Sequence, residues 1–367
     1  KIIKIGKKTD KENILVVKEN MNCHYSVDFD NLSFGSTFSD HMFVCDYANG
    51  KWGEPQIIPY APIQLDPSAS ALHYGQAVFE GMKAYKDDAD GVWLFRPEEN
   101  FTRINKSSER LSIPEFPEEF FFEGLEKLLD MDKEWIKKGA GNSLYVRPFV
   151  FASQAGVQAS ASNAYKFMII CSPVSSYYSS GEVHVQVAEK FSRAAAGGVG
   201  YAKAAGNYAA QFYPTTLAQK EGFQQIIWTD ANTHEYLEEA GTMNIFFRIN
   251  DTLITTPTSD RILDGITRKS ILQLAAHLGI KTDVRPISIH ELLSSKEDGS
   301  LKEIFGAGTA VVVSPIKGFG YQNKRHILED APDSFAAILK DHIVNIQRNV
   351  VPDPFGWRHE VKTTVSV

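Results

Sequence analysis

The sequence predicts a two-domain fold that mixes α-helices and β-strands, of the α+β or α/β class. The chain has 367 residues, which is more than one compact core usually holds. Strand-like and helix-like segments alternate in both halves. A polar, Ser- and Tyr-rich stretch, SPVSSYYSSGE (172–182), lies near the middle of the chain, where a linker is expected. We therefore expect a small N-terminal domain (1–174), an interdomain loop (175–182) and a larger C-terminal domain (183–367). The alternative is that residues 172–182 form a hairpin loop inside one domain.

In the first half, the patterns predict three strands and two helices. HMFVCDY (41–47) alternates as a strand does, and the aromatic and β-branched runs 144–152 and 165–174 are also typical of strands. Residues 97–113 have helical spacing, with a proline near the first turn. A longer helix is expected over residues 117–138, ending before Gly139.

In the second half, strands are expected at 183–188, 224–230, 242–250 and 252–256, with a turn at Asn250-Asp251. A strand broken by a Gly-rich turn is expected over 303–313. The apolar spacing predicts helices over 208–220, 267–278 and 334–348, the first of them bent at Pro214. Ser288 and Glu291 form a capping-box pattern, which predicts a further helix.

Composition and charge exclude several classes of protein. The hydrophobic content of 43% and charged content of 23% are typical of soluble globular proteins, and the net charge of -7 argues against nucleic-acid binding. No apolar run is long enough for a membrane helix, and the charged N-terminus does not resemble a signal peptide. The three cysteines match neither a zinc site nor a disulfide framework, so no metal is expected. A cytoplasmic location fits, or an organellar one if a transit peptide was removed.

Lys203 stands in the stretch AAAGGVGYAKAAGNYAA (194–210), where it is the only ionisable group apart from the phenols of Tyr201 and Tyr208. Small neighbours allow a cofactor to approach closely, and removal from water lowers the pKa of an amine. A neutral amine can form a Schiff base with an aldehyde cofactor. The alternative is a flexible Gly/Ala loop with an incidental lysine.

An aldehyde cofactor such as pyridoxal phosphate needs a carboxylate at its ring nitrogen. Glu239 lies in EYLEEAGTMNIFF (235–247), at the entry to an almost wholly apolar strand, and an acid is costly there unless it is paired. The alternative is that Glu238 and Glu239 belong to a solvated turn.

The phosphate of that cofactor needs fixed donors, and DGITRKS (264–270) offers them where a loop becomes a helix. There Ile266 and Thr267 can present backbone N–H groups and a hydroxyl, although Thr267 is equally well explained as an ordinary N-cap. The turn with Gly306, Gly308 and Thr309 can also approach an anion. Arg103 can supply positive charge, and its alternative is an exposed helix arginine. Motifs for phosphoryl transfer, nicotinamide binding and zinc are absent from the sequence.

Taken together, several segments resemble the signatures of branched-chain amino-acid aminotransferases. The resemblance runs from about residue 34 to residue 315, in order and with similar spacing. The matching segments are FSDHMF, LHYGQAVFEGMKAY, LFRPEENFTRI, SLYVRPF, GGVGYAKAAGNYA, EEAGTMNIFF, LDGITRKSIL and FGAGTAVV. The resemblance implies a fold type IV pyridoxal-phosphate enzyme with a smaller α/β N-terminal domain and a larger C-terminal pseudo-barrel domain. It also implies a homodimer with an active site at the domain interface.

By motif position, the resemblance implies a role for each cofactor-binding residue. Lys203 is the Schiff-base lysine and moves the proton, Glu239 holds the ring nitrogen, and Tyr208 contacts the ring oxygen. The phosphate is bound by Arg103, Ile266, Thr267 and Thr309.

The resemblance also implies a substrate pocket. Phe38, Phe79, Tyr145 and Tyr177 line an apolar cavity for a branched side chain, and Tyr74 comes from the partner subunit. Thr309 and Ala310 bind the α-carboxylate, with Thr242 nearby, and Arg147 meets the second carboxylate of glutamate or 2-oxoglutarate.

The implied reaction moves the amino group of leucine, isoleucine or valine to 2-oxoglutarate and gives the 2-oxo acid and L-glutamate. Two other readings stay open: a D-amino-acid aminotransferase or lyase of the same fold, and a non-catalytic metabolite-binding protein. Val311 and Ser314 stand where some relatives have a redox-active cysteine pair, so no such thiol switch is expected.

Overall fold

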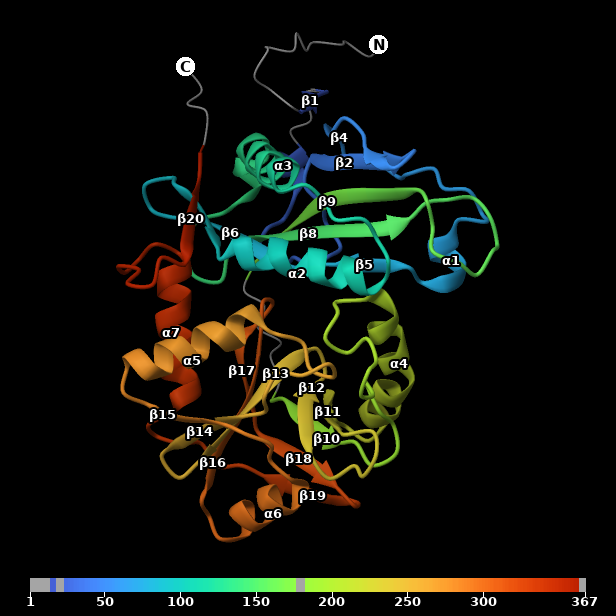
Figure 1. Cartoon of the computed structure of the whole chain (residues 1–367). Helices are drawn as coiled ribbons and strands as arrows, with labels where there is room; N and C mark the ends of the chain where they lie inside the picture. Colours follow the sequence, from blue (N-terminus) through green and yellow to red (C-terminus); the bar gives the residue numbers. More distant parts are fainter. Residues whose placement is uncertain (1–13, 18–22, 176–181, 363–367) are drawn as a thin grey trace. The chain divides into compact units, whose positions relative to one another are not determined.

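The computed structural model describes residues 14–17, 23–175 and 182–362. The chain divides into two compact units (Figure 1). Unit 1 comprises Lys1–Tyr177, Lys203–Ala205 and Ile346–Val367, and unit 2 comprises Tyr178–Ala202 and Gly206–Asn345. The end of the chain thus belongs to the unit that holds its beginning, whereas the sequence placed all of residues 183–367 in one domain.

Unit 1 is built on one sheet whose strands run in the order β1-β4-β2-β9-β8-β6-β7-β20, with β3 beside β2 and β5 beside β8. All of these pairs are antiparallel except β1 with β4. The strands are β1 (Leu15–Val16), β2 (His41–Ala48), β3 (Lys51–Trp52), β4 (Gln56–Pro59), β5 (Ala77–Phe79), β6 (Met82–Lys86), β7 (Val92–Phe95), β8 (Ser143–Ala152), β9 (Tyr165–Val174) and β20 (Arg358–Val361). The helices are α1 (Ser70–Tyr74), α2 (Pro97–Arg110) and α3 (Glu118–Met131), with short 3-10 turns at Cys23–Ser26 and Lys133–Trp135.

The C-terminal strand explains why the chain end belongs to unit 1. β20 pairs antiparallel with β7, and Arg358 lies opposite Phe95. Two side-chain hydrogen bonds add to this contact: Tyr85 donates to Gln347, and Asn349 donates to Asp87. A sheet edge that would otherwise expose unpaired backbone groups is thereby covered.

The helix predicted over residues 117–138 is shorter in the structure. α3 ends at Met131, and a 3-10 turn follows over Lys133–Trp135. Asp132 lies at this break, where its buried carboxylate accepts the backbone N–H of His41 and contacts His41 Nδ1 at 2.6 Å. The tertiary contact with β2 ends the helix, and local helical spacing does not reveal it.

Unit 2 also contains one sheet, of mixed type, in the order β15-β14-β13-β12-β11-β10-β18-β19, with β16 joined to β13 and β17. The strands are β10 (His184–Val187), β11 (Gln225–Thr229), β12 (Leu237–Ala240), β13 (Met243–Ile249), β14 (Thr252–Thr255), β15 (Lys281–Val284), β16 (Leu301–Gly308), β17 (Val312–Ile316), β18 (Gly318–Tyr321) and β19 (Lys324–Ile327). The helices are α4 (Ala205–Lys220), α5 (Ile266–His277), α6 (Ile289–Glu297) and α7 (Phe335–Gln347). The capping box is confirmed, because Ser288 accepts the backbone N–H of Glu291 at the start of α6.

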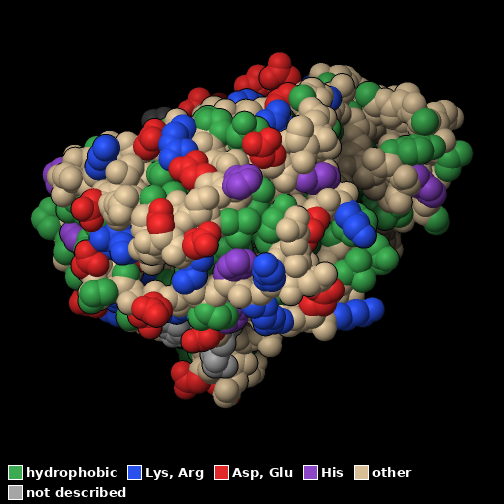
Figure 2. Space-filling model, turned by 90° about the horizontal axis from the view of Figure 1, so that it is seen from below, with side chains coloured by type: hydrophobic (Ala, Val, Ile, Leu, Met, Phe, Trp, Pro, Cys, Tyr) green, Lys and Arg blue, Asp and Glu red, His purple; other side chains and the backbone are tan. Residues whose placement is uncertain are grey.

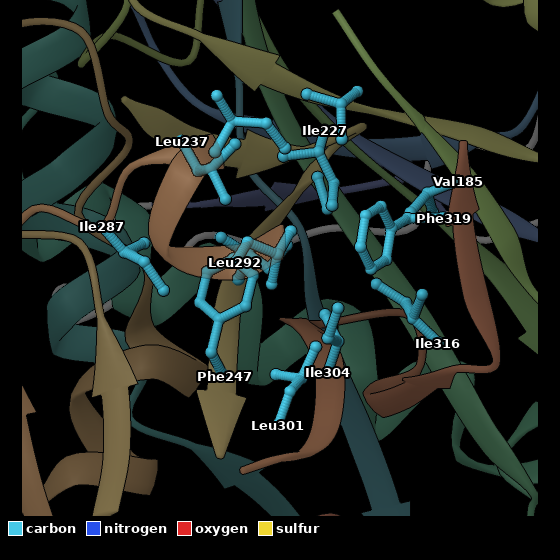
Figure 3. Close-up of a cluster of buried hydrophobic side chains, with 14 of the residues drawn as sticks. Val185, Ile227, Leu237, Phe247, Ile287, Leu292, Leu301, Ile304, Ile316 and Phe319 are labelled. Atoms are coloured by element: carbon cyan, nitrogen blue, oxygen red, sulfur yellow. The ribbon is translucent and has the colours of Figure 1, made fainter. Parts of the chain in front are cut away.

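Each unit has a hydrophobic core of its own. In unit 2, apolar side chains from eight strands and α6 interlock, including Val185, Ile227, Phe247, Leu292 and Phe319 (Figure 3). In unit 1, the stacked rings of Phe116 and Phe167 lie 3.7 Å apart between centroids. Burial of each such side chain contributes about 1.5–3 kcal/mol. The strands that carry the polar site residues are therefore held rigidly.

The surface carries charged side chains of both signs. On the face shown in Figure 2, basic and acidic side chains are intermixed, without an extended patch of one sign. Within the described ranges, no helix combines the length and the apolar character needed to cross a membrane. Nor do the described residues contain a group of three or more His, Cys, Asp or Glu side chains able to hold a metal ion.

Candidate functional site

Lys203 is fixed to unit 1 by its backbone. Its N–H donates to Ser107 Oγ at 2.9 Å, and its carbonyl accepts the N–H of Phe79 at 3.1 Å. The next residue, Ala204, forms a bridge with Val78. Lys203 is half-buried and anchored on both sides of its peptide unit, so the structure contradicts a flexible loop with an incidental lysine.

The ring of Phe79 brings the predicted amine together with the predicted carboxylate-binding arginine. Lys203 Nζ lies 5.1 Å from the centre of this ring, and the Arg147 guanidinium carbon lies 4.6 Å from it. Arg147 also donates to the hydroxyl of Tyr145 at 2.9 Å. An amine and a guanidinium thus lie together at an aromatic wall formed by the rings of Phe79 and Tyr145.

Arg147 has one buried nitrogen that the described part of the protein does not satisfy: its Nε makes no hydrogen bond there. An unsatisfied buried donor costs about 1–3 kcal/mol. A carboxylate ligand would remove this cost, because guanidinium groups match carboxylates in shape and charge.

Close packing surrounds Tyr145 and Phe38. A Cβ on Gly81 would lie 2.1 Å from the Tyr145 hydroxyl, so only glycine permits the tyrosine to occupy its position. Phe34 packs edge-on against Tyr145, at 5.0 Å between centroids, and the ring of Phe38 stacks on Tyr60 at 4.8 Å.

Of two further predicted pocket residues, Tyr74 and Tyr177, the structure describes only the first. Tyr74, expected to reach a partner subunit, lies at the end of α1 with 47% of its surface exposed, and its hydroxyl contacts the Val157 carbonyl. Tyr177 lies outside the described residues.

Arg103 is buried on α2, so the structure contradicts the alternative of an exposed helix arginine. Its Nε and Nη2 donate to the two oxygens of Glu80, at 2.6 and 2.8 Å. Burial alone raises the pKa of the Glu80 carboxyl. The charge and hydrogen bonds of Arg103, the charge of Lys203 and a hydrogen bond from Asn100 outweigh burial, so the pKa of Glu80 is lowered.

Glu239 is buried on β12 in unit 2, with 2% of its surface exposed, and is not part of a solvated turn. Its Oε1 accepts the backbone N–H of Leu263 at 2.7 Å and the amide of Asn244 at 3.2 Å. Its Oε2 lies 3.0 Å from Nε of Arg193. Glu238, on the same strand, is also buried, and it accepts from Nε of Arg261 at 2.5 Å.

Arg193 is held by backbone carbonyl groups. Its Nη1 donates to the carbonyl of Arg261 at 2.7 Å and its Nη2 to that of Gly200 at 3.1 Å. The Nε that faces Glu239 is buried and makes no aligned hydrogen bond within the described residues, although the charges are in contact. The arginine therefore places a positive charge beside the Glu239 carboxylate.

The start of α5 is where the predicted phosphate donors lie in unit 2. Ile266 and Thr267 are both buried, at 6% and 7% exposure. Gly265 is the N-cap and no side chain caps the helix, so the alternative of Thr267 as an ordinary N-cap is wrong. A Cβ on Gly265 would meet Asn244 Oδ1 at 1.8 Å, and this glycine lets the helix start pack against the neighbour of Glu239.

The other predicted ligands of unit 2 lie at turns and on α4. Thr309 and Ala310 are in the turn between β16 and β17, and Thr242 is in the hairpin between β12 and β13. Tyr208 is half-buried on α4. The predicted residues thus fall into two groups: Lys203, Arg103 and the aromatic wall belong to unit 1, and the Glu239 and α5 group belongs to unit 2.

Sequence reasoning missed Glu80, Arg193 and Asn244. Glu80 carried a signal similar to that of Glu239, because it is an acid in an otherwise apolar run, AVFEGM (77–82). Arg193 directly precedes the uncharged stretch around Lys203, so it could have been considered as a partner for a buried acid. Asn244 carried no such signal, because an uncharged amide in a strand can pair with many different groups and does not indicate a particular partner.

Comparison with known proteins gives consistent results. Residues 77–319 match the family described as amino-transferase class IV. The chain is 46% identical to branched-chain-amino-acid aminotransferase 2 of Bacillus subtilis over 334 residues, which is 90% of this chain and 92% of that protein.

Solved structures show the same fold. The branched-chain aminotransferase of Thermoproteus uzoniensis, solved with norvaline, has a TM-score of 0.73 and 21% identity, over 88% of this chain and all of that one. The branched-chain amino acid aminotransferase of Thermobaculum terrenum, in its PLP form, has a TM-score of 0.72 and 18% identity, over 89% of this chain and 99% of that one. The predicted fold type is confirmed.

Proposed function

Because this chain belongs to the class IV aminotransferases and is a branched-chain amino-acid aminotransferase, we propose that it transfers the amino group of L-leucine, L-isoleucine and L-valine to 2-oxoglutarate, using pyridoxal phosphate. The observation that carries the proposal is the arrangement around Phe79, where Lys203 and Arg147 lie on one ring beside Tyr145. An amine suited to proton transfer and a guanidinium suited to a carboxylate are what this reaction needs in one pocket.

The donor set of the chain fits pyridoxal phosphate. When bound, this cofactor supplies an aldehyde that accepts an amino group and a ring that spreads negative charge. Lys203 would hold the aldehyde carbon, Glu239 the ring nitrogen and Tyr208 the ring oxygen. Arg103, Ile266, Thr267 and Thr309 would hold the phosphate. A buried carboxylate and an uncapped helix start are complementary to a protonated ring nitrogen and an anion.

The residues of the chain act on the substrate in a definite order. Lys203 Nζ, which lies 5.1 Å from the centre of the Phe79 ring, would take the proton from the α-carbon of the amino acid and would deliver a proton on the other side of the amino nitrogen, at the carbon that the cofactor aldehyde would supply. The second substrate, 2-oxoglutarate, then accepts the amino group by the reverse path, so the kinetics are ping-pong.

The pocket must accept both an apolar chain and a carboxylate. Phe38, Phe79, Tyr145 and Tyr177 would contact the branched side chain, and Arg147 would bind the second carboxylate of glutamate. An apolar pocket separates side chains that differ by one methylene by only about 1–3 kcal/mol. All three branched substrates are therefore accepted.

The α-carboxylate of either substrate would bind at the turn of Thr309 and Ala310, with Thr242 nearby. Tyr74 would complete the pocket of a partner subunit in a homodimer, which its exposure on α1 supports. The three free thiols, Cys23, Cys45 and Cys171, suit the reducing conditions of the cytoplasm.

The decisive experiment follows the absorbance of the purified protein loaded with pyridoxal phosphate. We expect L-leucine to bleach the cofactor band and 2-oxoglutarate to restore it. Borohydride reduction and peptide mapping should place the cofactor on Lys203, and Lys203→Ala should abolish turnover. Absence of bleaching, or a label on another residue, would contradict the proposal. D-glutamate as product would instead favour a D-amino-acid aminotransferase.

A further inference from the structure

Glu80 is a completely buried carboxylate, with 0% of its surface exposed, that contacts Arg103 rather than solvent. We infer that Glu80 is a positioning residue that fixes the Arg103 guanidinium for the phosphate of the cofactor. This inference rests on the proposed function, because it needs Arg103 to be a phosphate ligand.

The geometry of the Glu80–Arg103 pair fixes the orientation of the Arg103 guanidinium group as well as its position. Glu80 accepts from Nε and Nη2 of Arg103, which lie on one edge of the planar guanidinium group. Two parallel hydrogen bonds on one edge define the plane of the group and the direction in which its opposite edge points. A single bond, or a lysine ammonium in place of the guanidinium, would leave that direction undefined.

Glu80 is itself held in place. Its Oε2 also accepts from Asn100 Nδ2 at 2.6 Å and from the backbone N–H of Gly81 at 3.1 Å, and its own N–H donates to the Pro148 carbonyl at 2.7 Å. The carboxylate therefore cannot follow the arginine if the arginine moves. The Glu80 carboxylate therefore holds the Arg103 side chain of α2 in one position.

Stability alone does not explain this pair. Burying two charges costs several kcal/mol per ion, and the attraction between them often no more than offsets this cost. A well-packed apolar pair of similar volume would hold α2 on β5 at least as well. The charged pair instead provides a guanidinium of fixed orientation, next to the segment that anchors Lys203.

Electrostatics and positioning predict opposite effects of removing the charge of Glu80. If Glu80 only offset the charge of Arg103, then Glu80→Gln would leave more positive charge and strengthen binding of a phosphate. If Glu80 positions Arg103, then the glutamine would present an N–H₂ group toward the guanidinium, disturb its orientation and weaken binding. The direction of the change therefore decides between the two effects.

The experiment measures the dissociation constants of pyridoxal phosphate and of pyridoxal, which lacks the phosphate, from the full-length protein. We expect Glu80→Gln to weaken pyridoxal phosphate binding at least about tenfold and to change pyridoxal binding less than about twofold. Arg103→Lys keeps the positive charge but loses the two parallel N–H donors of the guanidinium edge. It should likewise weaken binding of pyridoxal phosphate and leave that of pyridoxal nearly unchanged. The double variant should be little worse than either single variant, because both changes remove one interaction.

The matched control is Glu303→Gln in unit 2. Glu303 is also buried and paired with an arginine, Arg248, at 3.2 Å, and it accepts backbone N–H groups at the start of α7. It should lower thermal stability and leave both dissociation constants unchanged. If Glu80→Gln leaves pyridoxal phosphate binding unchanged or makes it tighter, the inference is wrong.

A second variant keeps the test decisive if Glu80→Gln does not fold. Asn100→Ala removes one donor to Glu80 and no charge, and we expect it to weaken pyridoxal phosphate binding about threefold, without affecting pyridoxal. Equal affinity of wild type and Asn100→Ala would then overturn the inference. A wild-type protein that binds no pyridoxal phosphate would instead refute the proposed function.

Discussion

Two buried acid–arginine pairs, Glu80–Arg103 in unit 1 and Glu239–Arg193 in unit 2, use the same residue types in opposite ways. Arg103 gives both N–H groups of one guanidinium edge to Glu80, which is otherwise bound by Asn100 and Gly81. Arg193 gives its Nη groups to backbone carbonyls, and only its charge faces Glu239. In unit 1 the acid holds the arginine, whereas in unit 2 the arginine supports the acid.

In each pair we treat one member as the support and the other as the group that meets the ligand. Glu80 is bound by the N–H of Gly81 and a neighbouring amide, so its position is fixed and Arg103 is the group presented. Arg193 is bound by two carbonyl groups, so its position is fixed and Glu239 is the group presented. Both acids accept a backbone N–H and a side-chain amide. The two pairs differ in the arginine, because Arg103 gives Nε and Nη2 to its acid, whereas Arg193 gives its Nη groups to backbone carbonyls.

The largest effect expected from this comparison is that of Glu239→Gln. The glutamine keeps the shape and can still accept from Leu263 and Asn244, but it no longer carries the negative charge that a protonated ring nitrogen requires. We expect kcat to fall about 100-fold, equivalent to about 2.7 kcal/mol in the activation barrier, and the cofactor absorbance to shift. Stopped-flow absorbance measures both quantities.

The control for this variant is the neighbouring acid on the same strand. Glu238→Gln removes a buried carboxylate that pairs with Arg261 and points to the opposite face of β12. It should lower the free energy of unfolding by about 1–3 kcal/mol and leave kcat within about twofold. Equal loss of activity in the two variants would show that Glu239 has no special place in the reaction.

A smaller effect is expected for Arg193→Lys. A lysine keeps the positive charge beside Glu239 but cannot also donate to the carbonyl groups of Arg261 and Gly200 in a fixed fork. We expect kcat to fall about tenfold with little change in the KM for leucine, since Arg193 acts only through Glu239. Steady-state kinetics with leucine and 2-oxoglutarate give both parameters.

A double variant tests the coupling of the two residues directly. Adding Arg193→Lys to Glu239→Gln should cost little more than Glu239→Gln alone, because the supporting charge then has no carboxylate to act on. Fully additive losses would mean that Arg193 supports the fold and not the acid.

Much of the fold follows from the sequence because it depends on local patterns. The strands β8 and β9, the helices α5 and α7 and the capping box of α6 lie within a residue or two of their predicted positions. The end of α3 does not, because the contact between Asp132 and His41 joins residues 91 positions apart. The pairing of β20 with β7 also joins distant segments, and a domain boundary drawn at one point in the chain cannot represent it.

For the site, the sequence identifies the groups that look isolated but not the groups that hold them. Lys203 stands out because it is the only charged residue of its stretch, and Glu239 because it is an acid at the entry to an apolar strand. Their supports do not: Glu80 lies 23 positions from Arg103, and Arg193 lies 46 positions from Glu239. Which acid meets which arginine is decided by strand register and helix packing, which a single sequence does not encode locally.

The smallest predicted effect concerns a partly exposed acid–base cluster, which contrasts with both buried pairs. His359 of β20 contacts Glu98 of α2 through Nδ1 and Glu126 of α3 through Nε2, each at 3.1 Å. The hydrogen bond to Glu98 raises the pKa of His359, and burial lowers it less. The stabilisation is therefore complete below the unfolded pKa of about 6.5 and is lost as pH rises through the higher folded value.

We expect wild type to be more stable than His359→Gln by less than about 1 kcal/mol at pH 5.5, and the difference to disappear at about pH 9. The pKa of Glu80 is shifted in the opposite direction. Because this pKa is lowered, the stabilisation by the Glu80–Arg103 pair is complete above the unfolded pKa of about 4.3 and is lost as pH falls through the folded pKa. Urea unfolding of wild type and His359→Gln at several pH values measures their difference in stability. A salt concentration of 1 M should reduce this difference, because the His359 cluster is partly exposed. A difference that stays constant from pH 5.5 to 9 would show that His359 stabilises by packing rather than by charge.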